Sequence, residues 1–270
     1  MIHSKQSTHT IAATVIVVSL TSLFAGGCRR SHRNDLDYDY HIVQTITIDE
    51  LSEQPLLQFE SVFWEPDDSL ALRKLISEDG IAEGRKVLEI GTGTGLISLV
   101  CAGNGADAVV ATDINPAAVA NARYNAAMLE LDSRLDVRQV DAQSPDAFSV
   151  IRPDERFDLI LSNPPWEDGQ IEKPADHAFY DPQFALMDSL LAGLPTHLNP
   201  GGRCLLAYGH VPAISRLLKE AERMGYQTKV LDDRKLDELA TNFLPGMLVE
   251  IRLGKNQIPS DPVSAESDQP

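Results

Sequence analysis

The sequence predicts an α/β fold: a mainly parallel seven-stranded sheet with helices on both faces and an antiparallel last strand. Two observations lead to this prediction. Short apolar runs alternate with helical patterns from about residue 86 to residue 253, which is typical of repeated βα units. Glycine, proline or asparagine stands at many of the junctions between them, as expected where strands and helices end. A chain of 270 residues has the size of one such domain.

Seven apolar runs account for the expected strands. They are Lys86–Ile90, Ala108–Thr112, Asp136–Val140, Phe157–Ser162, Arg203–Tyr208, Thr228–Leu231 and Met247–Leu253. Helical patterns between them predict helices at Leu96–Ala102, Pro116–Leu129, Gln183–Leu198 and Pro212–Met224. Asn115 is the expected N-cap of the second of these helices, and Gly225 the expected stop of the fourth.

The chain divides into four expected parts. Residues 1–28 form a signal-like or membrane-anchor segment, and residues 29–54 a polar lead-in that contains a possible strand at Ile42–Ile48. Residues 55–255 are expected to form the main α/β domain. The polar, proline-bearing residues 256–270 are expected to be a disordered tail.

The first 28 residues predict attachment to a membrane. An apolar run from Ile11 to Gly27 follows Lys5 and ends before Cys28, which is the layout of a secretory signal. The small residues before Cys28 resemble a bacterial lipobox, so Cys28 is a lipidation candidate. Three arginines within residues 29–33 favour instead a signal anchor with the catalytic domain in the cytoplasm. A soluble cytoplasmic protein with a start placed too far upstream is the alternative.

The charge and the cysteines exclude several classes of function. The formal net charge is −17, and no basic stripe is visible, which argues against binding of bulk nucleic acid by charge alone. A nucleic-acid substrate held by a local patch or a partner subunit stays open. Cys101 and Cys204 lie in apolar runs and are expected to be buried thiols. Their spacing fits neither a disulfide framework nor a zinc site, so we expect no metal.

The end of the first expected strand carries a glycine loop. Gly91, Gly93 and Gly95 stand in the turn between this strand and the next helix, where a missing Cβ lets a ligand approach the backbone. Asp113 ends the second strand and suits ribose hydroxyls, and Asp141 ends the third and suits an exocyclic amine. Open α/β sheets bind ligands at this carboxyl edge. Together these residues predict a nucleoside-binding site.

At this point the chain resembles a known family. "VLEIGTGTGLISL", "ATDINPAAVANARYNA", "VRQVDA" and "FDLILSNPPW" are similar to successive motifs of the class I S-adenosylmethionine-dependent methyltransferases, in the methyltransferase small domain group. The resemblance spans residues 63–253 and implies a Rossmann-like methyltransferase fold and S-adenosylmethionine as cofactor. It implies that the following residues bind the cofactor: Glu89, Gly91, Thr92, Gly93 and Gly95 around its methionine part, Asp113 and Ile114 at its ribose, Asp141 and Ala142 at its adenine, and Asn163.

The fourth expected strand ends in Asn163, Pro164, Pro165 and Trp166, the predicted catalytic residues. An amide nitrogen is a poor nucleophile because its lone pair is delocalised. The side-chain oxygen of Asn163 and the carbonyl of Pro164 can accept the two N–H bonds of the substrate and so favour a more tetrahedral nitrogen. The prolines fix the backbone in advance, and Trp166 offers a flat face on which a planar amide can stack.

The expected activity is N-methylation, and the methyl acceptor is less well defined. A protein glutamine is the favoured acceptor, because the chain is acidic and lacks a basic appendage. Amino groups of adenine or guanine in RNA or DNA are the alternative, and a non-catalytic, membrane-tethered nucleoside-binding protein is a third reading. Phe63, Phe179 and Tyr180 are candidate substrate contacts, although packing is the simpler role for the last two. His177 either carries a proton or is an ordinary surface residue.

Overall fold

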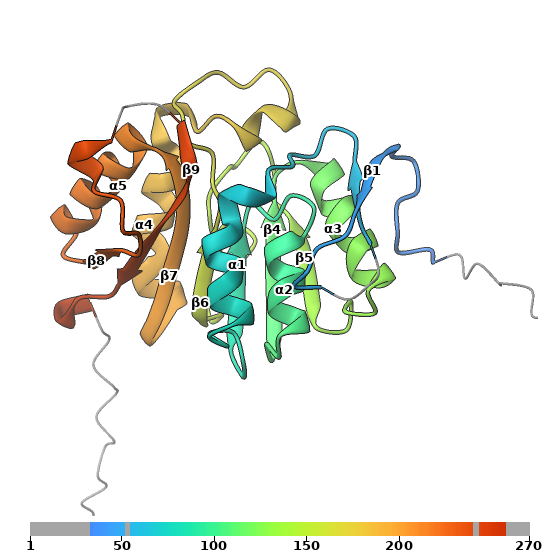
Figure 1. Ribbon diagram of the computed structural model, residues 1–270, viewed down its shortest axis with the longest axis horizontal. Helices are drawn as coiled ribbons and strands as arrows, with labels where there is room; N and C mark the ends of the chain where they lie inside the picture. The colour runs from blue at the N-terminus through green and yellow to red at the C-terminus, as the bar shows by residue number, and fades with distance from the viewer. Residues whose placement is uncertain (1–32, 52–54, 240–242, 258–270) are drawn as a thin grey trace, which may run out of the picture. The chain divides into compact units, whose positions relative to one another are not determined.

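The computed structural model of the protein describes residues 33–51, 55–239 and 243–257 (Figure 1). The signal-like segment 1–28, with Cys28 as its lipidation candidate, and the expected tail from residue 258 onward lie outside the described residues. Within the described ranges, no helix combines the length and the apolar character needed to cross a bilayer. The compact unit that contains the sheet begins at Asp35.

Seven strands form the main sheet, in the order β5-β4-β3-β6-β7-β9-β8. β9 is antiparallel to both of its neighbours, β7 and β8, and the other pairings are parallel. This confirms the predicted sheet with its antiparallel last strand. The bounds are β3 Lys86–Ile90, β4 Ala108–Asp113, β5 Leu135–Gln139, β6 Phe157–Ser162, β7 Leu198–His210, β8 Gln227–Val230 and β9 Phe243–Arg252.

Within the described residues, the helices α1 to α5 cover the two faces of the sheet (Figure 1). Apolar side chains of α1, α2 and α3 pack in one cluster with Val87 and Leu161, whereas those of α4 and α5 pack in another with Leu88 and Ile160. The side chains of neighbouring residues in one strand, such as Val87 and Leu88, thus point to opposite faces of the sheet, as in any pleated strand. The bounds are α1 Leu70–Ser77, α2 Leu96–Gly103, α3 Pro116–Met128, α4 Ala185–His197 and α5 Val211–Arg223.

The helix ends follow the local sequence. The side chain of Asn115 accepts a hydrogen bond from the backbone N–H of Ala117, which confirms it as the N-cap of α3. Gly225 follows α5 with φ +79°, the left-handed conformation that ends helices. β7 begins five residues earlier than the Arg203 expected from the sequence, because Leu198 at its start pairs with Phe157.

A small hairpin precedes the sheet. β1 (Ile42–Ile46) pairs antiparallel with β2 (Leu56–Phe59), a strand that the sequence reading did not predict. Two fully buried asparagines of α3 hold β2: the backbone N–H of Leu57 donates to Asn125 Oδ1 at 2.9 Å, and that of Phe59 to Asn121 Oδ1 at 2.8 Å. Asn125 Nδ2 also donates to the carbonyl of Thr94, at 2.8 Å. The side chain of Asn125 therefore links the hairpin to the glycine loop.

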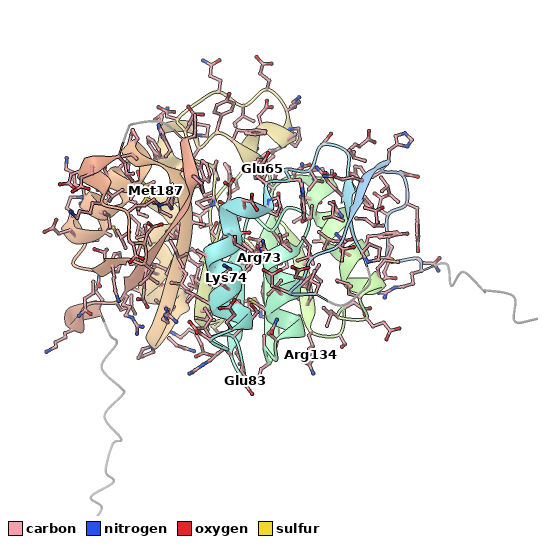
Figure 2. The ribbon with its side chains drawn as sticks, in the orientation of Figure 1. Glu65, Arg73, Lys74, Glu83, Arg134 and Met187 are labelled. Carbon is pink, nitrogen blue, oxygen red and sulfur yellow. The ribbon has the colours of Figure 1, made fainter. Side chains whose placement is uncertain are left out.

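The segment between the hairpin and α1 is fixed by a buried arginine. Arg73, labelled on α1 in Figure 2, donates to the carbonyl of Pro66 at 3.1 Å and forms an ion pair with Glu50. Pro66 opens the 3₁₀ turn η1 (Pro66–Ser69), which leads into α1. Ser69 occupies the N-cap position of α1 but makes no side-chain capping bond. This segment forms one wall of the pocket described next.

Candidate active site

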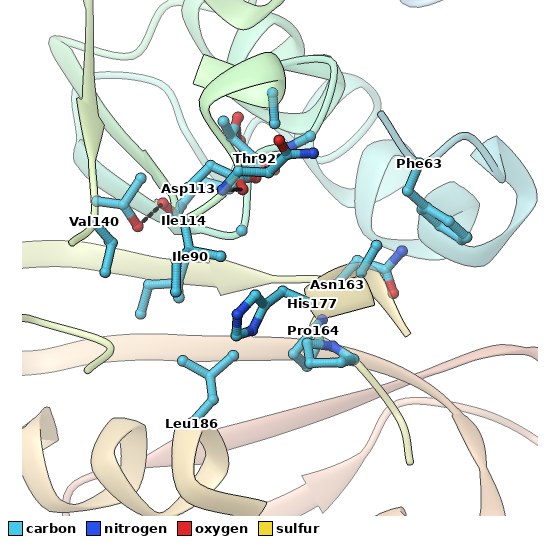
Figure 3. A pocket seen from close by; sticks show the side chains of 18 of the residues that line it. Phe63, Ile90, Thr92, Asp113, Ile114, Val140, Asn163, Pro164, His177 and Leu186 are labelled. Carbon is cyan, nitrogen blue, oxygen red and sulfur yellow. Dashed lines mark hydrogen bonds between the residues drawn. The ribbon is translucent and has the colours of Figure 1, made fainter. Parts of the chain in front are cut away.

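A pocket of about 240 Å³ opens at the carboxyl edge of the sheet, where β3, β4 and β6 end (Figure 3). The glycine loop, Asp113 and Asn163 line the same pocket. The segment between β6 and α4 lines its other side through His177 and Tyr180 among others, and Leu186 of α4 also lines it. Residues predicted separately from the ends of three strands therefore meet in one cavity.

The glycine loop takes a conformation that side chains disfavour. Gly91, Gly93 and Gly95 have φ of +75°, +55° and +88°, in the left-handed region that glycine adopts readily. Beyond Gly91 no atom lies within 4 Å of where a Cβ would stand, and beyond Gly93 the nearest is at 3.9 Å. At Gly95 the same position lies 3.2 Å from Ala122. The first two glycines leave open space for a ligand, and the third lets α2 and α3 pack closely.

Glu89 holds the glycine loop through hydrogen bonds. It is buried, and its Oε2 accepts hydrogen bonds from Thr92 Oγ1 at 2.6 Å and from the backbone N–H of Ser98 at 3.0 Å. Burial raises the pKa of Glu89 to about 7, against the opposing effect of these hydrogen bonds. Glu89 also lines the pocket. Its carboxyl group thus fixes the turn that the cofactor would contact.

Asp113 accepts a hydrogen bond from the glycine loop and also lines the pocket. Its Oδ2 accepts from the backbone N–H of Gly93 at 2.9 Å, and its Oδ1 from that of Asn115 at 2.9 Å. Burial raises the pKa of Asp113, and the backbone hydrogen bonds lower it. A carboxylate has about four lone-pair sites, so acceptor capacity remains beyond these bonds. The arrangement suits the predicted contact with ribose hydroxyls, and Ile114 lines the pocket beside it.

Asp141, the third acid predicted to bind the cofactor, lies outside the pocket lining. Asp141 is exposed, its Oδ1 accepts from the backbone N–H of Gln143 at 2.9 Å, and neither Asp141 nor Ala142 lines the pocket. From this part of the chain the pocket is lined instead by Val140, Pro145, Asp146 and Ala147. The adenine contact of Asp141 and Ala142 stays a prediction, and Asp146 is a lining acid that the sequence reading missed.

Asn163 presents an acceptor without a partner. Its Oδ1 is buried and forms no hydrogen bond with any described residue, although buried polar atoms are normally paired. The strand tip that carries it is held in place, because Ser162 Oγ donates to the carbonyl of Ile90 on β3 at 2.6 Å. Asn163, Pro164 and Pro165 all line the pocket, and Figure 3 shows Asn163 beside Pro164. An unpaired acceptor at this point suits a ligand that donates N–H groups.

Trp166 is not among the residues that line the pocket. Its indole Nε1 donates to the carbonyl of Ala207 on β7 at 3.2 Å, and its ring stacks on Phe243 at a centroid distance of 6.3 Å. Its own carbonyl is 3.2 Å from His210 Nδ1. These contacts tie the end of the Asn-Pro-Pro-Trp stretch to β7. The stacking of substrate on Trp166 stays a prediction.

Two of the three candidate substrate contacts line the pocket. Phe63 lines the pocket and meets Phe179 edge-to-face at 5.4 Å, whereas Phe179 is 51% exposed and lies outside the lining. Tyr180 lines the pocket, and a Cβ at Gly169 would stand 2.3 Å from its ring. Gly169 therefore makes room for the Tyr180 ring. His177 lines the pocket too, which its place in a long polar loop did not indicate.

Comparison with known proteins identifies what this chain resembles. Residues 68–230 match the family described as "Methyltransferase small domain". A release factor glutamine methyltransferase of Cereibacter sphaeroides is 41% identical over 46% of this chain and 46% of its own length. A Methanocaldococcus jannaschii protein, whose name gives it as a candidate protein N5-glutamine methyltransferase, is 30% identical over 64% of this chain and 86% of its own length.

Solved structures share the fold. The crystal structure of an S-adenosylmethionine-dependent methyltransferase from Agrobacterium tumefaciens aligns with a TM-score of 0.54 at 19% identity, over 78% of this chain and 70% of that one. The comparisons confirm the predicted Rossmann-like methyltransferase fold, the expected family and S-adenosylmethionine as its cofactor. No cluster of side chains suited to a metal ion occurs within the described ranges.

Proposed function

We propose that this chain, which belongs to the methyltransferase small domain family, transfers the methyl group of S-adenosylmethionine to the side-chain amide nitrogen of a protein glutamine. The observation that carries the proposal is the buried, unpartnered Oδ1 of Asn163 in the pocket that the glycine loop also lines. A primary amide has two N–H donors, and this acceptor lacks a donor.

The pocket fits the cofactor in two respects. Open space beyond Gly91 and Gly93 admits a ligand against the backbone, and Asp113 has lone pairs left for ribose hydroxyls. When bound there, S-adenosylmethionine supplies an electrophilic methyl group on a positively charged sulfur. Glu89, through Thr92 and Ser98, keeps the loop in the shape that this binding requires.

Asn163 and Pro164 then prepare the acceptor. Among the described residues, no hydrogen bond reaches the carbonyl of Pro164, so this oxygen and Asn163 Oδ1 are both free to accept. Holding the two N–H bonds of the amide aligns its nitrogen with the methyl group, and such preorganised acceptors need no rearrangement during reaction. The anchoring of the strand tip by Ser162 and Trp166 supports this rigidity.

Glutamine is favoured over a nucleobase by charge and by similarity. A net charge of −17 opposes the approach of a polyanion. Two of the similar proteins carry names that refer to glutamine methylation. Because this chain spans only 46% of the length of the Cereibacter protein, the release factor is proposed as acceptor from that similarity and from the site together.

Labelled S-adenosylmethionine and a purified bacterial release factor test the proposal. We expect label in the protein, located by peptide mass spectrometry on one glutamine, and no label when that glutamine is replaced by glutamate. In parallel, a lysate is labelled with the same cofactor, and portions of it are digested with nuclease or with protease. This experiment shows which class of molecule carries the label. Label removed by nuclease and left by protease would assign the activity to RNA or DNA and reject the glutamine acceptor.

We also propose that the chain is attached to a membrane through residues 11–28, with lipidation of Cys28 as one form of attachment. The apolar run and the small residues before Cys28 support this. The mass of the native, purified chain tests it. A lipid on Cys28, or an intact N-terminus recovered in the membrane fraction, is the expected result. A chain found in the soluble fraction with an unmodified N-terminus beyond residue 28 would contradict it.

A further inference from the structure

Two phenylalanine rings lie exposed near the active-site pocket. Phe179 is 51% exposed and Phe243 is 58% exposed, and no other phenylalanine within the described ranges is exposed. Burying such a ring would remove a large apolar surface from water. Exposed apolar side chains that gather in one place are typical of interaction surfaces. The surroundings of these two rings therefore indicate whether they form such a surface.

Phe243 packs against two other aromatic rings at the carboxyl edge of the sheet. Its ring stacks on that of Trp166 at a centroid distance of 6.3 Å and on that of His210 at 5.3 Å, with 24° between the ring planes in each pair. His210 ends β7 and pairs with Phe243 at the start of β9. Because β6 and β7 are parallel neighbours, this is also the edge where Asn163 follows β6.

Backbone hydrogen bonds join the segment of Phe179 to the same place. The N–H of Glu167 donates to the carbonyl of Phe179 at 3.3 Å, and the N–H of Asp181 donates to the carbonyl of Glu167 at 2.7 Å. Glu167 directly follows Trp166, and it forms a parallel β-bridge with Tyr180. The segment that carries Phe179 therefore runs alongside the end of the Asn-Pro-Pro-Trp stretch.

Phe63 connects these rings to the pocket. It lines the pocket and meets Phe179 edge-to-face, with 5.4 Å between the ring centroids. Figure 3 shows the amide of Asn163 turned toward the side on which the Phe63 ring lies. We call this set of five residues the aromatic rim: Phe63, Trp166, Phe179, His210 and Phe243.

A glutamine whose amide reaches Asn163 must leave its own backbone outside the pocket, because the amide stands at the end of a short aliphatic stem. The residues on either side of that glutamine then lie on the surface that borders Asn163. On the side to which the Asn163 amide turns, that surface carries Phe63 and, in contact with it, Phe179. The aromatic rim is thus continuous with the proposed binding site of the amide.

The charge of the pocket favours a polypeptide over a nucleic acid on the aromatic rim. Aromatic rings also stack on nucleobases, but sites for single-stranded nucleic acid combine such rings with a positively charged groove along the phosphates. Among the described residues that line the pocket there is no lysine or arginine, whereas five have carboxyl groups: Glu65, Glu89, Asp113, Asp146 and Asp181. A chain of phosphates would meet acids here, and a neutral or basic polypeptide would not be repelled.

We propose that the aromatic rim is the docking surface for the polypeptide segment that flanks the methylated glutamine, an inference that rests on the proposed glutamine methylation. Phe179 and Phe243 bind apolar groups of this segment, and their exposed faces become buried on binding. Trp166 and His210 hold Phe243 in place by stacking. The rim binds the acceptor, and the chemical step takes place in the pocket.

Phe179→Ala and Phe243→Ala test the aromatic rim from two separate segments of the chain. With saturating S-adenosylmethionine and the release factor as acceptor, we expect each substitution to raise KM about tenfold, as for residues that contribute strongly to an interface. The value of kcat should stay close to that of wild type. Calorimetry in the presence of S-adenosylhomocysteine should show the Kd of the release factor raised by a similar factor.

A small acceptor separates docking from chemistry. The methyl ester of N-acetylglutamine carries the same side-chain amide without flanking residues, so both variants should methylate it with the kcat/KM of wild type. Val43→Ala is the control, because Val43 on β1 is 61% exposed and lies outside the pocket lining. It should behave as wild type with both acceptors. Melting temperatures close to that of wild type would show that all three variants fold.

A wild-type KM and Kd for the release factor in either Phe179→Ala or Phe243→Ala would overturn the docking surface and leave the glutamine acceptor intact. An equal loss with the small acceptor would also overturn it, since the ring would then act in the pocket. If wild type labels nucleic acid and not the release factor, the proposed function is wrong and the polypeptide on the rim is wrong with it. A single-stranded RNA that binds Phe243→Ala less tightly than wild type would then identify the rim as a nucleic-acid surface.

Discussion

Gly93 and Asp113 are joined by a hydrogen bond of 2.9 Å, in which the backbone N–H of the glycine donates to Oδ2 of the aspartate. The two residues are separated by 20 positions: Gly93 lies in the turn after β3, and Asp113 is the last residue of β4. One carboxylate thus holds the glycine loop and also lines the pocket. In the proposed function, a change at Asp113 would therefore affect both the loop conformation and cofactor binding.

Asp113→Ala is expected to weaken cofactor binding. It removes the acceptor of two backbone N–H groups, and leaving partly buried donors unpaired costs about 1–3 kcal/mol. Calorimetry with S-adenosylmethionine should show an affinity at least about tenfold lower than wild type. An unchanged affinity would mean that neither the ribose contact nor the support of the loop depends on this carboxylate.

Asn163→Ala should separate chemistry from binding. The unpaired Oδ1 has no structural partner to lose, so the fold and the cofactor affinity should remain close to wild type. The rate of methyl transfer should fall by about 10²–10³-fold, the range for removing one preorganised group that stabilises a transition state. Calorimetry and single-turnover assays on the same preparation measure both. An equal loss of binding in Asn163→Ala and Asp113→Ala would refute the separate roles.

Gly91→Ala and Gly95→Ala form a matched pair, because both residues have positive φ. Each alanine carries the strain of a left-handed residue, about 1–2 kcal/mol. Only at Gly95 does the added Cβ also press on Ala122, at 3.2 Å. Thermal unfolding should therefore show the larger loss of stability for Gly95→Ala. Gly91→Ala should mainly reduce cofactor affinity, since its Cβ enters open space. The reverse order of melting temperatures would contradict this assignment.

Glu89 should make the protein less stable as the pH rises. Its pKa in the folded state is about 7, above its ordinary value of 4.5, so between these values the folded chain binds more protons than the unfolded chain. Its contribution to stability is therefore complete below pH 4.5 and lost as the pH passes through about 7. Glu89→Gln lacks this titration. The melting temperature of wild type relative to Glu89→Gln should fall across this window, and a constant difference would reject the raised pKa.

The sequence by itself determined the order of strands and helices and the chemistry at the strand ends. Alternating apolar runs, the glycine turn at Gly91–Gly95 and the Asn163–Trp166 stretch are local patterns, and each acts through neighbouring residues. The caps at Asn115 and Gly225 are equally local. These features therefore appeared in the structure close to where they were predicted.

Only the tertiary structure decided which side chains face the pocket. Trp166 bonds to Ala207, 41 positions away, instead of lining the pocket. β2 is held by Asn121 and Asn125, 62 and 68 positions away. His177 enters the pocket because its loop is tied to the segment after Trp166. The physical reason is that a polar loop has no periodicity to orient its residues, so contacts between distant parts of the chain determine where each side chain points.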